Sequence, residues 1–370
     1  MNLAKLMNCR AVNVRPLSQF PGISQSEKVV VAESDNNFAS EIDDFDRQIL
    51  FELDKNCRQS TAQLTEKLGR SRQTIEYRIK RLQDLKVLTG FNAIFNASKM
   101  GFYPYKFKLK LRNVPEDRQR LLDHLYSIGR VYWIGQSSGS WDMLFGVFYK
   151  SKLELVEIVN GLNLNFPRSI VDIHGNEIIE IIQFPKMYLT RQIVEPKHHT
   201  SADTVESKLD DVDYLILAEL IQNARIPVNH LAKNVGASPA ITRRKMQLLE
   251  ERGIIVQDRI GVDHKKLGYD FYKAVFKLNG FTEAEHQRFY EHICRIPELQ
   301  FYLRNLWSVE LELMAGSFEY YQSIIDDIKR AFPRMLGEYD TLLLSTDEWT
   351  TAFTNYLRIS SEDCRLAAAS

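Results

Sequence analysis

Several common signatures are missing from this chain of 370 residues, and each absence narrows its class. No uncharged apolar run approaches the roughly 20 residues that a membrane-spanning helix needs. The four cysteines, Cys9, Cys57, Cys294 and Cys364, lie far apart and form no C-x-x-C pair, which argues against a zinc site and a disulfide framework. A nucleophile elbow and a phosphate-binding glycine loop are absent too. We therefore expect a soluble protein of the reducing cytoplasm with no membrane segment, metal, cofactor or enzymatic activity.

Net charge is also missing, since 48 lysines and arginines balance 48 aspartates and glutamates. Long-range attraction by the whole protein therefore cannot bring it to nucleic acid, and such affinity has to come from local basic patches. One patch is the stretch GRSRQTIEYRIKRLQDLKVLTG, residues 69–90, in which six lysines and arginines accompany only Glu76 and Asp84. Taken alone, this patch is typical of a solvated helix face as well as of a nucleic-acid contact.

An internal repeat organises the chain, because residues of the first half match residues 167 positions later. The register holds over about 65 residues. The matched pairs include Asp46 and Asp213, Leu53 and Leu220, Gly69 and Gly236, Ser71 and Ser238, and Lys106 and Lys273. A register of this length indicates a tandem duplication, hereafter copy one and copy two.

The repeat and the polar, non-periodic segments predict the domain boundaries. Each copy consists of a helical unit followed by a β-rich unit. The predicted segments are a flexible tail over 1–40, helical unit one over 41–100, β-rich unit one over 101–189, a linker over 190–208, helical unit two over 209–267, β-rich unit two over 268–357, and a tail over 358–370.

Each helical unit has the pattern of three short helices. In copy one, apolar spacing predicts helices near 42–56 and 61–68, and Gly69 supplies the turn that permits a positive φ. Ser71 caps a third helix over 72–84. Two short apolar stretches, one after each third helix, are typical of a β-hairpin wing; they are KVLTGFNAIFN at 86–96 and RGIIVQDRIGVD at 252–263. The pattern predicts a winged helix-turn-helix, whose third helix enters the major groove of DNA.

The predicted third helix of copy one has an exposed face of long cations and hydrogen-bonding side chains. Its members are Arg72, Gln73, Glu76, Tyr77, Lys80 and Arg81, with Arg78 at the margin. Because a cap, a glycine turn and a following apolar stretch accompany this face in both copies, we expect double-stranded DNA as the partner.

The β-rich units both follow the order βαββαβ, which predicts a ferredoxin-like sheet with its two helices on one face. The fold class expected is therefore α+β, with two copies of a winged helix-turn-helix followed by a ferredoxin-like domain. Strict alternation places Lys106, Lys108, Lys110 and Arg112 on one face of the first strand. We expect that face to be solvated or to face a partner, in preference to forming a second nucleic-acid surface.

This arrangement resembles the Lrp/AsnC regulators, the feast/famine transcription factors. The motifs that carry the resemblance are LTEKLGRSRQTIEYRIKRLQDLKVL and GSWD in copy one and LAKNVGASPAITRRKMQLLEERGII in copy two. It covers about 45–190 and again about 210–357. The resemblance implies a DNA-binding first domain and a second domain that assembles dimers or higher rings and often binds an amino acid between subunits.

By position, the resemblance assigns DNA contacts to both third helices. Together with the exposed face, the DNA-binding residues expected are Ser71, Arg72, Gln73, Thr74, Tyr77, Arg78, Lys80 and Arg81 in copy one and Ser238, Arg243, Arg244 and Lys245 in copy two. Copy two departs from the pattern, because Thr242 occupies the apolar core position of Ile75. That departure puts in question whether the second helix packs as the first does.

For a ligand, the resemblance points to the GSWD turn. Gly139 would let the backbone approach a small effector, and Asp142 would accept hydrogen bonds from an ammonium group. The alternative is a plain turn glycine and a solvated acid. In copy two we align Trp307 with Gly139 and Glu310 with Asp142, so an indole would fill the space. At most one amino-acid ligand per chain is then expected.

Two other functions compete with DNA binding. The same architecture serves siroheme decarboxylases in pairs, and these enzymes need histidine and arginine around a tetrapyrrole, whereas the YLRNLW stretch offers Arg304 with no histidine beside it in sequence. The other alternative is a protein-binding module, which salt-dependent DNA affinity would exclude. Under the leading hypothesis one chain imitates a dimer and binds two unlike half-sites. Assembly of several chains is compatible with this hypothesis.

Overall fold

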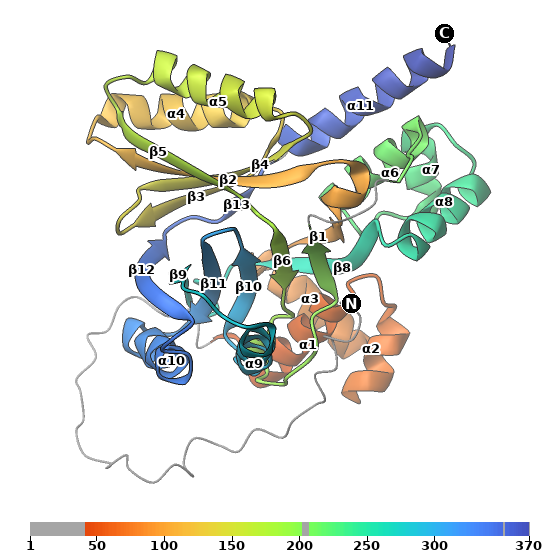
Figure 1. The fold of residues 1–370 in the computed structure, drawn as a ribbon. Coiled ribbons are helices and arrows are strands. Elements are labelled where there is room, and N and C mark those ends of the chain that lie inside the picture. Colours follow the sequence, from red (N-terminus) through yellow and green to blue (C-terminus); the bar gives the residue numbers. More distant parts are fainter. Residues whose placement is uncertain (1–40, 202–206, 351, 370) are drawn as a thin grey trace.

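The computed structural model describes residues 41–201, 207–350 and 352–369, in which the two copies are both visible (Figure 1). The expected tail over 1–40 lies outside these residues. The three helices predicted for copy one are α1 (Asp44–Lys55), α2 (Thr61–Leu68) and α3 (Arg72–Asp84). Those of copy two are α6 (Asp211–Gln222), α7 (Val228–Val235) and α8 (Pro239–Glu251).

Side-chain caps and glycines define where these helices begin and end. Asp43 and Ser60 each form a capping box, in which cap and third residue bond reciprocally to each other's backbone amide. Gly69 ends α2 with φ +62°, and Gly236 ends α7 with φ +69°, a region that glycine adopts without steric cost. The helix-turn-helix of each copy thus follows from local side-chain chemistry.

The prediction of a β-hairpin wing in each copy is wrong, because neither stretch pairs with itself. After α3 the chain forms one strand, β1 (Leu88–Phe95), and after α8 one strand, β8 (Ile255–Val262). These two strands pair with each other in an antiparallel two-stranded sheet. Each strand would otherwise leave a row of amide and carbonyl groups unpaired, and the other copy satisfies them. The shared sheet therefore joins the two helical units.

Both β-rich units have the ferredoxin-like order predicted, which confirms the α+β fold class. Copy one contains β2 (Tyr103–Leu111), α4 (Pro115–Ser127), β3 (Val131–Ser138), β4 (Met143–Tyr149), α5 (Lys152–Asn165) and β5 (Ile170–Glu177). Copy two contains β9 (Asp270–Leu278), α9 (Glu283–Ile293), β10 (Leu299–Arg304), β11 (Ser308–Ala315), α10 (Phe318–Ala331) and β12 (Leu336–Leu344). The strand orders are β5-β2-β4-β3 and β12-β9-β11-β10.

The two sheets exchange their last strands. After β5 the next strand, β6 (Glu180–Gln183), pairs with β10 of copy two. Reciprocally, β13 (Glu348–Trp349) pairs with β3 of copy one. A further strand, β7 (His198–Ser201), pairs with β6 and lies within the segment expected to be a linker. Over the described residues these pairings connect one 11-stranded sheet.

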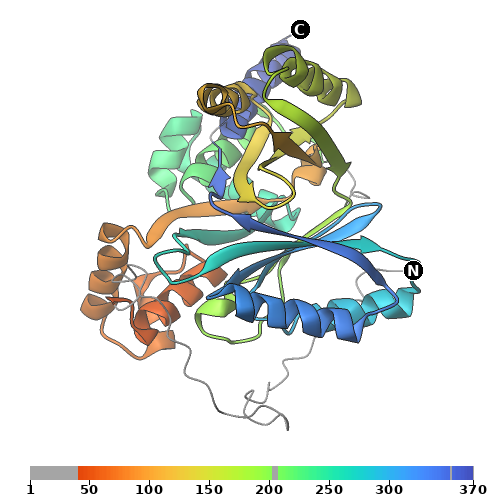
Figure 2. The same cartoon turned by 90° about the vertical axis from the view of Figure 1, so that its left-hand side faces the viewer.

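The layers follow from which face of each sheet carries helices. In Figures 1 and 2, α4 and α5 cover the outer face of the copy one sheet, and α9 and α10 cover the outer face of the copy two sheet. The inner faces pack against each other, and one hydrophobic core runs through both copies. One polypeptide thereby contains the interface that two chains would otherwise form.

The lysine stripe of β2 takes part in this packing. Lys106 and Lys108 are buried and pair with Glu310 and Glu312 on β11, whereas Lys110 at the strand end is half-buried. Lys273, the counterpart of Lys106, pairs with the same two glutamates. Of the two expectations for this face, contact with a partner applies to its buried lysines, and the partner is the other copy.

The prediction of a tail over 358–370 is wrong for residues 358–369, which are helical. Helix α11 runs from Ala352 to Ala369 and packs against α6. Leu357 is fully buried, and Arg358 forms a 2.7 Å ion pair with Glu219 of α6. The apolar face of this segment stabilises the helix by packing, although its last residues alone have low sequence complexity.

Candidate nucleic-acid interface

Helix α3 is positioned by its cap and its buried face. The Ser71 hydroxyl accepts a hydrogen bond from the Thr74 amide at 3.2 Å, and Ile75 and Leu82 are fully buried against the rest of the unit. The opposite face consequently points to solvent. Ser71, Arg72, Gln73, Tyr77 and Lys80 are all exposed, with 66% of Tyr77 accessible, and Thr74 is half-buried.

Arg78 and Arg81, both expected to contact DNA, form ion pairs within the helical unit. The Arg78 guanidinium lies 2.7 Å from Asp43 and 3.1 Å from Asp46, and Arg81 lies 3.0 Å from Asp46. Burial acts to raise the pKa of Asp43, but the Asp46 amide and Arg78 lower it below its usual value. These pairs fasten α3 to the start of α1, so we call them the α1–α3 lock.

Helix α8 has the same arrangement in copy two. Its Ser238 hydroxyl accepts from the Ile241 amide at 3.3 Å. Thr242 is fully buried, and its hydroxyl donates to the Ser238 carbonyl at 3.0 Å, so the polar side chain is satisfied and the helix packs despite the departure from an apolar residue. Arg243 and Arg244 are exposed.

The lock recurs in copy two with lysine in place of arginine. Lys245, expected to contact DNA, pairs with Asp210 and lies 2.9 Å from Asp213. Burial acts to lower the pKa of Lys245, but the two carboxylates raise it above its usual value. Lys245 therefore corresponds to Arg78 in structure as in sequence, and both hold their recognition helix in place.

Reciprocal hydrogen bonds hold the two helical units against each other. The Ala224 amide donates to the Phe91 carbonyl at 2.8 Å, and the Cys57 amide donates to the Asp258 carbonyl at 2.9 Å. The Arg58 side chain donates to the Ala224 carbonyl at 2.7 Å. Figure 1 shows both units on the same side of the β-layers, on either side of β1 and β8. The arrangement presents two basic helices from one molecule.

The expected effector turn has a different geometry from a binding site. Gly139 has φ +136°, and a Cβ there would lie 2.7 Å from the Thr341 carbonyl oxygen of copy two. Asp142 accepts a hydrogen bond from the Leu111 amide at 2.8 Å and pairs with Lys110 at 3.3 Å. The glycine therefore permits close packing of the two copies, and the carboxylate closes a turn within copy one.

The corresponding turn of copy two corrects our alignment. Strand pairing places Met143 opposite Leu109 and Val309 opposite Phe276, so Asp142 corresponds to Ser308 and not to Glu310. Trp307 is 70% exposed and fills no pocket.

A buried ionic group that was not predicted from the sequence joins α1 to β8. The Arg259 guanidinium grips both carboxylate oxygens of Asp54, and Lys186 lies 3.1 Å from the same carboxylate. Burial acts to raise the pKa of Asp54, but Arg259 and Lys186 hold it below its usual value. A signal was present, since the repeat replaces Asp54 by Ile221 and Arg259 by Asn92, so each charge occurs in one copy alone.

No cluster of three or more histidine, cysteine, aspartate or glutamate side chains in the described part of the chain could hold a metal ion. Within the same residues, no helix is long and apolar enough to cross a membrane.

Known proteins resemble the chain at both of its helical units. A family model described as winged helix-turn-helix DNA-binding matches residues 42–89 and again 209–256. The uncharacterized HTH-type transcriptional regulator PH1916 of Pyrococcus horikoshii is 32% identical over 121 residues, which cover 32% of this chain and 80% of that protein. The HTH-type transcriptional regulator LrpA of the same organism is 27% identical over 142 residues, which cover 35% of this chain and 97% of that protein.

Among solved structures, the siroheme decarboxylase NirDL resembles the whole duplicated arrangement. The similarity covers 89% of this chain and 100% of that chain, with a TM-score of 0.57 and 12% sequence identity, and so concerns the fold alone. The sequence matches instead identify the family, because PH1916 is 32% identical and 80% of its length is covered. This chain belongs to the Lrp/AsnC family and carries the family's two-domain unit twice.

Proposed function

We propose that this protein is a DNA-binding transcriptional regulator that contacts the major groove with α3 and α8. The observation that carries the proposal is the pair of capped third helices, each fastened to its first helix and each exposing long polar side chains. Such helices place their N-terminal residues against base edges while flanking cations neutralise phosphates. Relatives named as transcriptional regulators support the same function.

The two recognition helices differ in what they expose. Helix α3 offers Gln73, Tyr77 and Lys80, whereas α8 offers Arg243 and Arg244 beside an exposed Ile241. We therefore expect one chain to bind two unlike half-sites, separated by about 10 base pairs or a multiple of that spacing. One chain per site is the corresponding stoichiometry, because both helices come from the same polypeptide.

In vitro selection of random duplex DNA with the full chain tests this function. An enriched asymmetric motif is expected. Replacing Gln73 by Ala should relax preference at one base position by roughly 1 to 3 kcal/mol, while Lys80→Ala should weaken all sequences alike. A perfect palindrome would mean that two chains each present α3, and failure to enrich any motif would refute sequence-specific binding.

An amino-acid effector at Gly139 and Asp142 has less support from the geometry. Gly139 packs against β12, and Asp142 already has two partners within copy one. We propose that any amino-acid response does not use this turn. Calorimetry with the twenty amino acids checks this point, since binding that disappears in Asp142→Ala would restore the original hypothesis.

One cluster favours a second candidate function, that of a tetrapyrrole enzyme. The histidine missing beside Arg304 in sequence is supplied by α9, because His286 Nε2 lies 3.1 Å from the Tyr302 hydroxyl and 3.4 Å from Arg304. Burial lowers the pKa of His286, which keeps the imidazole neutral near pH 7.

We nevertheless propose that the chain is not an enzyme. His286, Tyr302 and Arg304 do not line the central cavity described below, and the Phe281 ring stacks on His286 and lies under Arg304. Titration with siroheme, followed by absorbance and by product analysis, decides between the two functions. Binding with release of carbon dioxide would favour the enzyme.

A further inference from the structure

A cavity of about 500 Å³ lies between the two copies. Its walls come from β1 and β8, from β2, β3 and β4 of copy one, and from β6, β10 and β11. Volumes of this size are typical of small-molecule sites in proteins. None of the exposed residues expected to contact DNA lines it.

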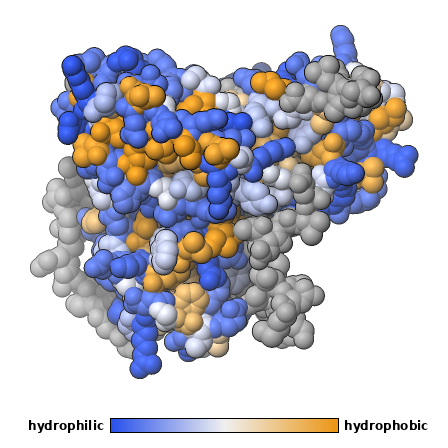
Figure 3. Space-filling view, turned by 45° about the horizontal axis from the view of Figure 1, so that its top comes forward, coloured by the Kyte–Doolittle hydropathy of each residue, from blue (hydrophilic) through white to orange (hydrophobic). Residues whose placement is uncertain are grey.

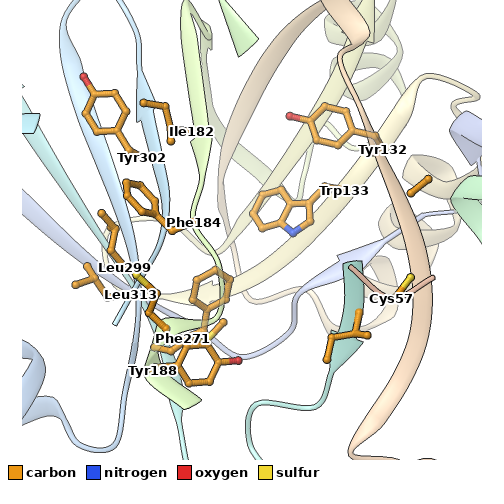
Figure 4. Close-up of a cluster of buried hydrophobic side chains, with 14 of the residues drawn as sticks. Cys57, Tyr132, Trp133, Ile182, Phe184, Tyr188, Phe271, Leu299, Tyr302 and Leu313 are labelled. Carbon is orange, nitrogen blue, oxygen red and sulfur yellow. The ribbon is translucent and has the colours of Figure 1, made fainter. Parts of the chain in front are cut away.

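Aromatic rings form much of the cavity wall. They belong to Phe95, Tyr132, Trp133, Phe148, Tyr188 and Phe301. Tyr132, Trp133 and Tyr188 are among the labelled side chains of the buried cluster in Figure 4. Such walls favour a ligand with an aromatic or other apolar body.

Hydrogen-bonding groups on the same wall have no partner within the described part of the chain. These are one terminal nitrogen of Arg259, the Tyr188 hydroxyl and His264 Nε2. Arg259 and Tyr188 are each 2% exposed. Arg259 is held rigidly, because its other two nitrogens bind Asp54 and the Phe184 carbonyl. Buried donors of this kind are costly when unmatched, so they indicate an acceptor in the cavity.

The other charges around the cavity are balanced by each other. The lining residues and their direct ion partners contain four cations, Lys106, Lys186, Arg259 and Lys273, and four carboxylates, Asp54, Glu310, Glu312 and Asp347. Of these cations, Arg259 has a buried terminal nitrogen with no partner among the described residues. An acidic group is the acceptor that matches this guanidinium nitrogen best, because hydrogen bonds between two charged groups are the strong ones.

We propose that the central cavity binds an organic anion with an aromatic or apolar body, whose acidic group accepts hydrogen bonds from Arg259 and Tyr188. The site is distinct from the GSWD turn and takes one ligand per chain, because both copies build a single cavity. Its occupation does not depend on DNA, so the proposed function and this site can fail independently.

Titration of the full chain with 8-anilinonaphthalene-1-sulfonate tests the site by fluorescence and calorimetry. The neutral analogue N-phenyl-1-naphthylamine has the same aromatic body without the sulfonate. We expect one saturable site for the anion and binding at least about tenfold weaker for the neutral compound. No saturable anion binding, or equal affinity for both compounds, would overturn the proposal.

Two variants identify the location. Tyr188→Phe removes a hydroxyl that has no partner among the described residues, and Arg259→Lys keeps a cation beside Asp54, so both are designed to preserve the fold. Each should weaken anion binding by about tenfold, whereas Tyr103→Phe, on a partly exposed residue outside the cavity, should not. Wild-type affinity in Tyr188→Phe would place the probe elsewhere and contradict the proposal.

A surface control completes the experiment. Leu153 and Leu164 of α5 are exposed, and apolar side chains gather on the upper part of Figure 3, the face that carries α4 and α5. The double change Leu153→Ser and Leu164→Ser should leave the affinity of the anion unchanged. Loss of binding in this variant would show that the probe occupies the surface and would refute the cavity site.

Discussion

The buried charges between the two sheets make a sharp prediction about stability. Glu310 lies 3.3 Å from Lys106, 3.1 Å from Lys108 and 3.0 Å from Lys273, and Glu312 contacts Lys106 and Lys273. All five groups are buried, with three cations against two carboxylates. Removing a carboxylate should therefore increase the excess of positive charge, whereas removing a lysine should abolish it.

The magnitudes follow from what each substitution leaves behind. Glu310→Gln leaves Lys106 and Lys273 with Glu312 alone and removes the carboxylate that pairs with Lys108, so it should lower the free energy of unfolding by about 3 to 5 kcal/mol. Lys108→Met leaves two lysines and two glutamates with an apolar side chain at the edge. Lys108→Met should lower the free energy of unfolding by less than about 1.5 kcal/mol or raise it slightly.

Urea unfolding measures the difference between these variants. Tryptophan fluorescence is a suitable signal, because Lys106 and Lys273 lie over the Trp133 ring at 4.9 and 5.5 Å. Glu76→Gln breaks the exposed pair of Glu76 with Arg72 and serves as a control with no measurable shift. Equal losses in Glu310→Gln and Lys108→Met would refute the argument from charge balance.

The same carboxylate gives the direction of a pH effect. Burial acts to raise the pKa of Glu310, but Lys108, Lys273 and Lys106 hold it well below its usual value. A folded pKa below the unfolded one stabilises the protein above the ordinary glutamate pKa, and this stability is lost as the pH falls through the folded pKa. The difference between wild type and Glu310→Gln should therefore shrink in acid.

Three further predictions concern single residues. Arg78→Ala should weaken DNA binding without changing its dependence on salt, because Arg78 fastens α3 to α1, whereas Lys80→Ala should reduce the salt slope by about one, as measured by titration at several salt concentrations. Gly139→Ala should cost about 3 kcal/mol in urea unfolding, against about 1 kcal/mol for Gly69→Ala, since both have positive φ but only Gly139 meets another backbone. Burial raises the pKa of Asp347 to about 6, so its stabilising proton is lost as the pH rises through 6, and Asp347→Asn should raise stability at pH 8 by about 1 to 2 kcal/mol but not at pH 4.

The helical units could be predicted closely because their determinants are local. Ser71 caps a helix three residues before its bonded amide, and Gly69 needs no distant partner to adopt a positive φ. The repeat supplied a second, independent copy of each signal. The ferredoxin-like order followed for the same reason, since alternation and helical spacing are properties of short windows.

The pairings between copies could not be predicted from such windows. A strand with one apolar face has the same pattern whether its neighbour is the next strand in sequence or, as for β1 and β8, a strand far along the chain. The position of Arg78 on the helix margin is likewise compatible with DNA or with Asp43, which lies 35 residues earlier. Only the assembled fold decides between these partners.

Some ion pairs occur in both copies, and others depend on charges that occur in one copy alone. The α1–α3 lock persists in both, as Arg78 with Asp43 and as Lys245 with Asp210. The interface charges do not, because strand pairing places Leu144 where copy two has Glu310 and Gly146 where it has Glu312. In a symmetric dimer every such residue would occur twice around the axis, and one buried anion site could not be built from unlike halves. A single chain can keep two recognition helices and still build one cavity from unlike halves, whereas two identical subunits would either repeat such a cavity or build it from identical halves on their axis.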